Sequence, residues 1–134
     1  MMPTMRPQTL VEVSSRVLSG ESFARALREF LDTWRTLTSD EVRRNAVQSP
    51  PSLLAGVAPD GAMMDAYMAA VAEKLLEDAG LRAPEWVYGS ERFLAYPWFA
   101  ATDFPGLRPL LLMESPTAFR RRHLFVSANA LDRA

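Results

Sequence analysis

The sequence predicts an all-α protein, built as a compact single-domain helical bundle with two long helices and several short helices toward the C-terminus. Apolar residues recur at helical spacing over residues 22–37 and 60–78. No stretch alternates apolar and polar residues for more than a few positions, and no hairpin turn is visible. A chain of 134 residues fits one domain. We therefore expect a flexible N-terminus over residues 1–8 and one helical domain of about five to seven helices over residues 9–134.

Three helices are predicted in the N-terminal half. The first has apolar residues at helical spacing from Leu10 to Val17 and ends at Gly20. The second begins after Ser22, whose hydroxyl can cap it. Its apolar face consists of Phe23, Leu27, Phe30, Leu31 and Trp34. Residues 38–41 resemble a capping box that opens a short third helix.

A crossover loop is predicted for residues 48–61, which carry three prolines and two glycines. The second long helix follows, from Asp60 to Asp78, and Gly80 ends it. Its apolar face consists of Met64, Tyr67, Met68, Val71 and Leu75. We expect the charged run EKLLED, residues 73–78, to form a solvated helix face.

The remainder of the chain has short apolar and aromatic clusters between turn residues. Pro84 and Ser90 are expected to begin short helices, and so is the pair Ser115–Pro116, with Ser115 as the cap. Residues 108–113, RPLLLM, could form a buried strand, but a lone strand has no partner, so we predict a helix there.

Three consecutive arginines lie between two phenylalanines near the C-terminus. On a helix over residues 117–126, with about 100° per residue, Arg122 falls among the aromatic residues, Arg121 at their edge and Arg120 away from them. Because a buried guanidinium needs a partner, we predict a structural ion pair for Arg122. The candidate carboxylates are Glu85, Glu91, Glu114 and Asp132. Contact with an acidic partner protein or with nucleic-acid phosphate is the alternative for this triplet.

Aromatic residues concentrate in residues 86–125. Most of them are expected to build the core of the second half. A sharper hypothesis leaves Trp98 and Phe99 exposed on short loops as interface anchors, because tryptophan and arginine are enriched at binding hot spots. The candidate partner-binding residues are accordingly Arg120, Arg121, Trp98 and Phe99.

No catalytic constellation is visible, and we expect a protein that is not an enzyme and holds no cofactor or metal. The chain has no cysteine and a single histidine, His123, which cannot build the usual zinc sites. Phosphate-binding glycine loops, calcium loops and nucleophile elbows are absent. A net charge of −1 disfavours nucleic acid as the main partner. No apolar run could cross a membrane, so we expect a cytoplasmic protein.

Two helices joined near Gly20 also permit a helix-turn-helix interpretation. Its reading helix would present Glu21, Ser22, Arg25 and Arg28 to DNA. An ordinary αα-hairpin is commoner, and the acidic residue at the tip opposes phosphate. We therefore keep a helical transcriptional regulator, or an accessory protein for nucleic acid, as the alternative function.

Several segments resemble a group of small bacterial proteins that are encoded beside nucleotidyltransferase-like proteins and regarded as antitoxins. The segments are SGESFARALREFLDTW, DAYMAAVAEKL, APEWV, ERFLAYPWF and ESPTAFRRRHLFVSANALDRA. The resemblance extends from about Val13 to Ala134. It implies a non-enzymatic protein that neutralises a nucleotidyltransferase-type toxin by direct binding, and it supplies no catalytic residue. A homodimer stays open.

Overall fold

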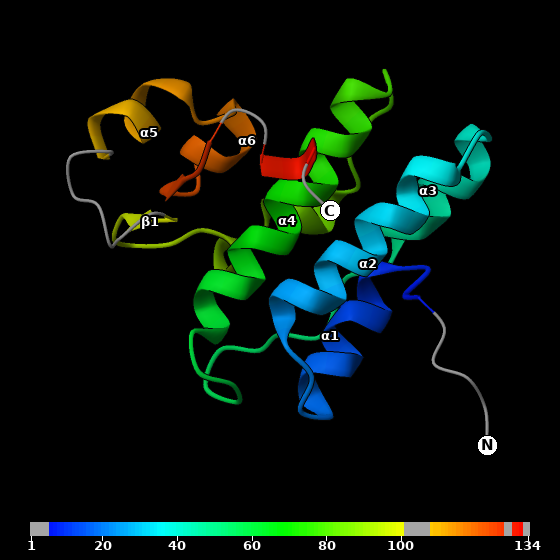
Figure 1. Cartoon of the computed structure of the whole chain (residues 1–134), viewed down its shortest axis with the longest axis horizontal. Helices are drawn as coiled ribbons and strands as arrows, with labels where there is room; N and C mark the ends of the chain where they lie inside the picture. The colour runs from blue at the N-terminus through cyan, green and yellow to red at the C-terminus, as the bar shows by residue number, and fades with distance from the viewer. Residues whose placement is uncertain (1–5, 101–107, 128–129, 133–134) are drawn as a thin grey trace.

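The structure, a computed structural model, describes residues 6–100, 108–127 and 130–132. Within them the chain forms six α-helices, three short 3₁₀ helices and two strands of two residues each (Figure 1). In chain order the elements are α1 (Leu10–Leu18), α2 (Phe23–Thr36), α3 (Asp40–Gln48), α4 (Gly61–Asp78), η1 (Glu85–Tyr88), η2 (Ser90–Arg92), β1 (Trp98–Phe99), α5 (Arg108–Glu114), α6 (Thr117–Arg120), β2 (Leu124–Phe125) and η4 (Ala130–Asp132). The predicted all-α class is confirmed, including a helix where RPLLLM stands, with one small parallel sheet added.

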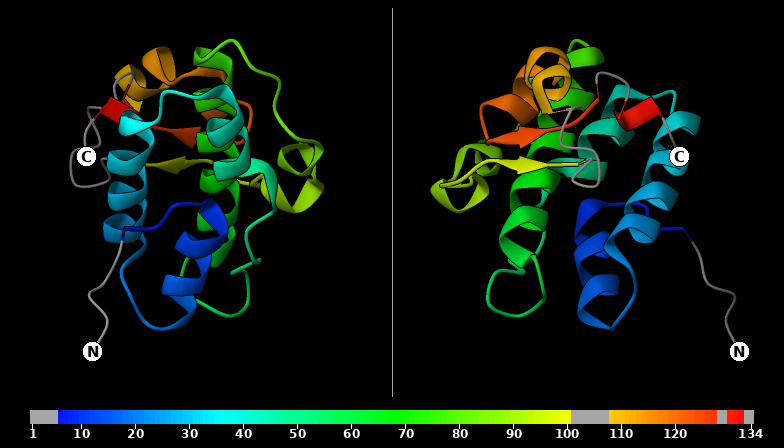
Figure 2. Two further views of the ribbon diagram at one scale, coloured as in Figure 1. Left: turned by 90° about the vertical axis from the view of Figure 1, so that its right-hand side faces the viewer. Right: turned by 60° about the vertical axis from the view of Figure 1, so that its left-hand side comes forward.

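Helix α4 runs through the middle of the molecule (Figure 1). Helices α1, α2 and α3 lie on one side of it, while α5, α6 and the two strands lie on the other, as Figure 2 shows from two further directions. Ala66, Ala69 and Ala70 are fully buried on α4, and such small side chains allow close approach by the neighbouring elements. The helix is therefore buried around most of its circumference, whereas the sequence indicated a single apolar face.

Side-chain caps begin the N-terminal helices. The Ser22 hydroxyl accepts a hydrogen bond from the Arg25 backbone N–H at 3.3 Å, as predicted for α2. In α3 the cap is Ser39, which accepts from the Val42 N–H, so the helix begins one residue later than the predicted capping box. Gly20 follows α1 with a φ of +102°, a left-handed conformation that glycine adopts without a steric penalty.

The loop between α3 and α4 is anchored by a buried carboxylate. Asp65 of α4 accepts hydrogen bonds from the backbone N–H groups of Leu54, at 2.7 Å, and Ala55, at 3.0 Å. Leu54 is itself fully buried. At Gly61, a Cβ atom would lie 2.0 Å from the Leu54 carbonyl oxygen. Only glycine at the start of α4 therefore lets the loop backbone pass this close.

The N-terminal segment is packed from Pro7 onward. Pro7 is buried, and the Gln8 backbone N–H donates to the Glu12 carboxylate. Pro7 and Gln8 thus contact the rest of the protein; the flexibility predicted for residues 1–8 stays a prediction, and residues 1–5 lie outside the described part of the chain.

The chain beyond Arg120 departs from the predicted helix over residues 117–126. Helix α6 ends at Arg120, and His123 adopts a φ of +62°, which turns the backbone out of the helical path. Strand β2 then pairs with β1 in parallel, with Trp98 opposite Leu124. Ser115 does not cap α6: its hydroxyl accepts from the Val126 N–H at 2.9 Å and so ties down the end of β2.

Candidate partner-binding surface

Arg122 is fully buried and forms an ion pair, as predicted, but with a different carboxylate. Its Nη1 atom lies 2.6 Å from Oε1 of Glu73 on α4, a residue outside the four candidates. Nη1 also donates to the Ala118 carbonyl and Nη2 to the Val87 carbonyl, both at 2.7 Å. Burial lowers the pKa of Arg122 from its ordinary value, and the Glu73 hydrogen bond opposes that shift. Arg122 therefore holds the C-terminal segment onto α4.

Glu73 corrects the prediction that residues 73–78 form a solvated face. Its exposed fraction is only 5%. The carboxylate bridges two arginines, because its Oε2 atom lies 3.1 Å from Nη1 of Arg121. Asp78 is exposed, as predicted for this run, and pairs with Lys74. A charge pattern cannot distinguish the two faces of this helix, because elements remote in sequence cover one of them.

Arg120 and Arg121 differ in the groups that their guanidinium nitrogens already contact. Arg121 is exposed but donates to Glu73, so one of its nitrogens is already engaged. Arg120 is also exposed, and its Nη2 donates to the carbonyls of Ser115, at 2.8 Å, and Met113, at 3.3 Å. These bonds place the Arg120 guanidinium against the C-terminal end of α5, which is where a cation is favoured.

Trp98 and Phe99 lie half-buried in β1 and not on an exposed loop, which corrects the geometry expected for them. The Trp98 and Tyr67 rings meet nearly at a right angle, with centroids 6.3 Å apart. Phe99 stacks on Phe125 at 5.1 Å, and the Arg108 guanidinium lies 4.9 Å from the Phe99 ring centroid. Both therefore serve packing first and offer only part of their surface to a partner.

The surface that the sequence interpretation missed is the apolar face of α5. We define it as Leu110, Leu112 and Met113, whose exposed fractions are 51%, 46% and 79%. Leu111 is the only buried residue of this helix. The run LLLM looked like core because apolar runs usually are. A seven-residue helix on the rim of the molecule can turn only part of that run inward.

A second buried charge pair, Arg92 with Asp65, also has a structural role. Arg92 donates to the Pro51 carbonyl at 2.7 Å, and its guanidinium lies 4.8 Å from the Trp86 ring centroid. Its Nη1 atom is 4.0 Å from Oδ1 of Asp65, the carboxylate that caps the loop. The pair fastens η2 and the loop after α3 onto α4.

The described part of the chain contains no group of three histidine, cysteine, aspartate or glutamate residues placed to hold a metal ion. Nor does any helix within it have the length and apolarity that crossing a bilayer requires.

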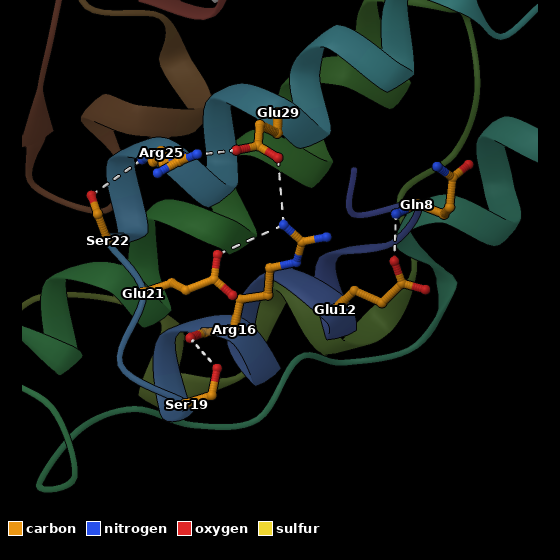
Figure 3. A network of polar contacts seen from close by, with 8 residues as sticks. All are labelled: Gln8, Glu12, Arg16, Ser19, Glu21, Ser22, Arg25 and Glu29. Carbon is orange, nitrogen blue, oxygen red and sulfur yellow. Dashed lines mark hydrogen bonds and ion pairs between the residues drawn. The ribbon is translucent and has the colours of Figure 1, made fainter. Parts of the chain in front are cut away.

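The candidate reading helix of the helix-turn-helix interpretation is occupied by internal contacts. Glu29 of α2 lies 3.2 Å from Nε of Arg25 and 3.4 Å from Nη1 of Arg16, and Glu21 lies 3.7 Å from Arg16 (Figure 3). Carboxylates thus surround the cations at this turn, and the network closes the α1–α2 hairpin. Among the arginines named for DNA, Arg28 is outside this network.

Comparison of the chain with models of protein families, with curated proteins and with solved structures gave no match.

Proposed function

We propose that this chain is a non-enzymatic binding protein of the antitoxin type, which neutralises a nucleotidyltransferase-type toxin by direct contact. The observation that carries the proposal is the exposed apolar face of α5 with Arg120 beside it. Clustered exposed apolar residues on a small protein typically mark an interaction site, and an arginine next to them is a common hot-spot composition.

The charge of the surface supports a cleft lined by carboxylates as the target. Arg120 uses only Nη2 for its contacts with Ser115 and Met113. Its remaining N–H donors can reach a carboxylate outside the chain. Nucleotidyltransferase clefts hold metal-binding carboxylates, so an apolar helix with a cation at its end would fit over such a cleft and occlude it.

The test is co-expression with the product of the adjacent gene, which the proposal expects to be nucleotidyltransferase-like, read out as growth and as co-purification. Met113→Glu and Leu110→Glu place a charge on the α5 face without touching the core, and Arg120→Glu reverses the cation. Each is expected to weaken toxin binding at least about tenfold, since hot-spot residues commonly contribute that much or more.

Matched controls come from exposed residues elsewhere. Val57→Glu changes an apolar residue that is 66% exposed in the loop before α4, and Arg44→Glu reverses an exposed arginine of α3. Both variants should neutralise like the wild type. Circular dichroism of every variant checks that the helices remain. Full neutralisation by all three α5-region variants, or recovery of free active toxin from wild-type co-expression, would overturn the proposal.

A further inference from the structure

An apolar groove lies between α2 and α4, on ground separate from the α5 face. Its volume is 390 Å³. The walls include Leu27 and Leu31 of α2, Met63 and Tyr67 of α4, Trp98 of β1 and Leu131 of η4. The η4 segment, red in Figure 1, reaches this groove because the Arg35 guanidinium donates to the Leu131 carbonyl at 2.7 Å. The groove is thus built by elements far apart in sequence.

Arg28 is the charged residue of this lining. It is exposed and has no ion-pair partner among the residues that the structure describes. Two further polar groups come with the walls, the hydroxyl of Tyr67 and the indole N–H of Trp98, and neither has a hydrogen-bond partner within the described ranges. A largely apolar hollow with a few unpaired donors is the usual construction of a small-molecule site.

A neighbouring hollow of 450 Å³ offers an instructive contrast. Its charged lining residues are Arg35, Arg43 and Asp78. Arg35 already pairs with Asp32, and Arg43 with Asp40. Its cations have carboxylate partners within the chain, whereas Arg28 has none among the described residues and lies at the edge of an apolar groove. The first groove is therefore the better candidate for a ligand site, and its ligand should carry a negative charge that pairs with Arg28.

We propose that the groove binds a small amphiphilic carboxylate, with the hydrocarbon body against Leu27, Met63 and Trp98 and the carboxylate on Arg28. A volume of 390 Å³ lies within the range of about 300–1,000 Å³ typical of small-molecule pockets. A protein partner would need roughly 800 Å² of surface on each side, more than this groove alone presents. A carboxylate suits this site because Arg28 is the only charged side chain in the described part of the lining, and its guanidinium can meet a carboxylate in a bidentate contact.

Sodium octanoate is the probe, titrated calorimetrically into the whole protein, with 1-octanol as the uncharged analogue. Arg28→Gln is expected to weaken octanoate binding about tenfold, the loss of one charge-assisted contact, and to leave 1-octanol binding unchanged. Ala24→Phe fills the groove from an exposed position of its lining and should abolish binding of both. Octanoate should also change the fluorescence of the wild type and not that of Trp98→Phe.

Two controls isolate the site. Arg44→Gln removes an exposed arginine outside the groove, and Met113→Glu alters only the α5 face; each should bind octanoate like the wild type. Failure of octanoate to saturate the wild type would overturn the inference. Unchanged binding in both Arg28→Gln and Ala24→Phe would place the octanoate elsewhere and overturn it too. Equal affinity for octanoate and 1-octanol would refute the carboxylate as the recognised group. None of these outcomes bears on toxin binding.

Discussion

Arg122 and Glu73 form a buried ion pair between Nη1 and Oε1 at 2.6 Å, although 49 residues separate them in the chain. The pair joins the segment after α6 to the central helix α4. The Phe93 ring lies 4.7 Å from the guanidinium carbon, and two backbone carbonyls complete its surroundings. The arginine triplet is thus divided between a residue that holds the fold and two that face outward.

Breaking this pair from one side should destabilise the protein strongly. We expect Glu73→Gln and Arg122→Met each to lower the free energy of unfolding by about 3–5 kcal/mol, because each leaves a buried group without its partner. The double variant Glu73→Leu/Arg122→Met should lose much less unfolding free energy than the two single variants lose together. Urea denaturation measures all of them. Asp78→Asn, which breaks the exposed pair with Lys74, is the control and should cost less than about 0.5 kcal/mol. Similar losses in the control and the buried variants would contradict the assignment.

Gly61 and Gly89 offer a second matched pair. Gly61→Ala should destabilise by about 1–3 kcal/mol, since the new methyl group would meet the rigid Leu54 backbone. Gly89→Ala meets only the flexible Glu91 carboxylate, which can swing aside, so its effect should stay within about 1 kcal/mol. Thermal unfolding of both variants checks the order. A Gly61→Ala protein as stable as the wild type would mean that the loop does not pass so close to α4.

Stability should fall at alkaline pH because of Tyr67. Burial raises the pKa of Tyr67 above its ordinary value of 10.0. The unfolded chain therefore loses this proton at a lower pH than the folded protein, so the contribution is intact below about pH 10 and is lost as the pH rises toward the folded pKa. Tyr67→Phe removes the effect and should flatten the decline in unfolding free energy between about pH 9 and pH 11. Tyr96→Phe, at an exposed ring, serves as the control; identical profiles for both variants would speak against a raised pKa of Tyr67.

His123 adopts a backbone conformation that most side chains avoid, with φ at +62°. Replacing it with glycine removes the steric cost of about 1 kcal/mol, partly offset by the freer unfolded chain, so the melting temperature should stay level or rise. His123→Val should lower stability by at least about 1 kcal/mol, because β-branched residues fit this region poorly. His123→Asn serves as the tolerated comparison. A valine variant that melts with the wild type would contradict the left-handed turn.

Local signals in the sequence predicted the helices well. The apolar spacing of α2 and the Ser22 cap both act within a few residues, so they can be recognised without knowing the rest of the fold. The turn at His123 could not be recognised in that way. It depends on pairing between Leu124 and Trp98 and on the Ser115 hydroxyl, all contacts between segments distant in sequence.

The burial of Arg122 was inferred from a helix that does not exist at that point. The inference held because the turn after α6 keeps Arg122 on the same side: its N–H donates to the Phe119 carbonyl at 3.0 Å. Its partner Glu73 could not be identified, since nothing in the charged run of residues 73–78 distinguishes the covered glutamate from the solvated ones. The exposed face of α5 was missed because an apolar run has the same sequence whether the fold buries it or leaves it in contact with water.

The two carboxylates that are buried among the described residues, Asp65 and Glu73, belong to α4, and each pairs with an arginine from a segment that comes later in the chain. If α4 were only partly docked, both carboxylates would lose the arginines that pair with them while still shielded from water. Intermediates in which only the C-terminal third has detached therefore have a high free energy. This favours unfolding of the molecule in a single cooperative step. Both ion pairs must form before α4 is fully docked, so the two are expected to form in the same refolding step.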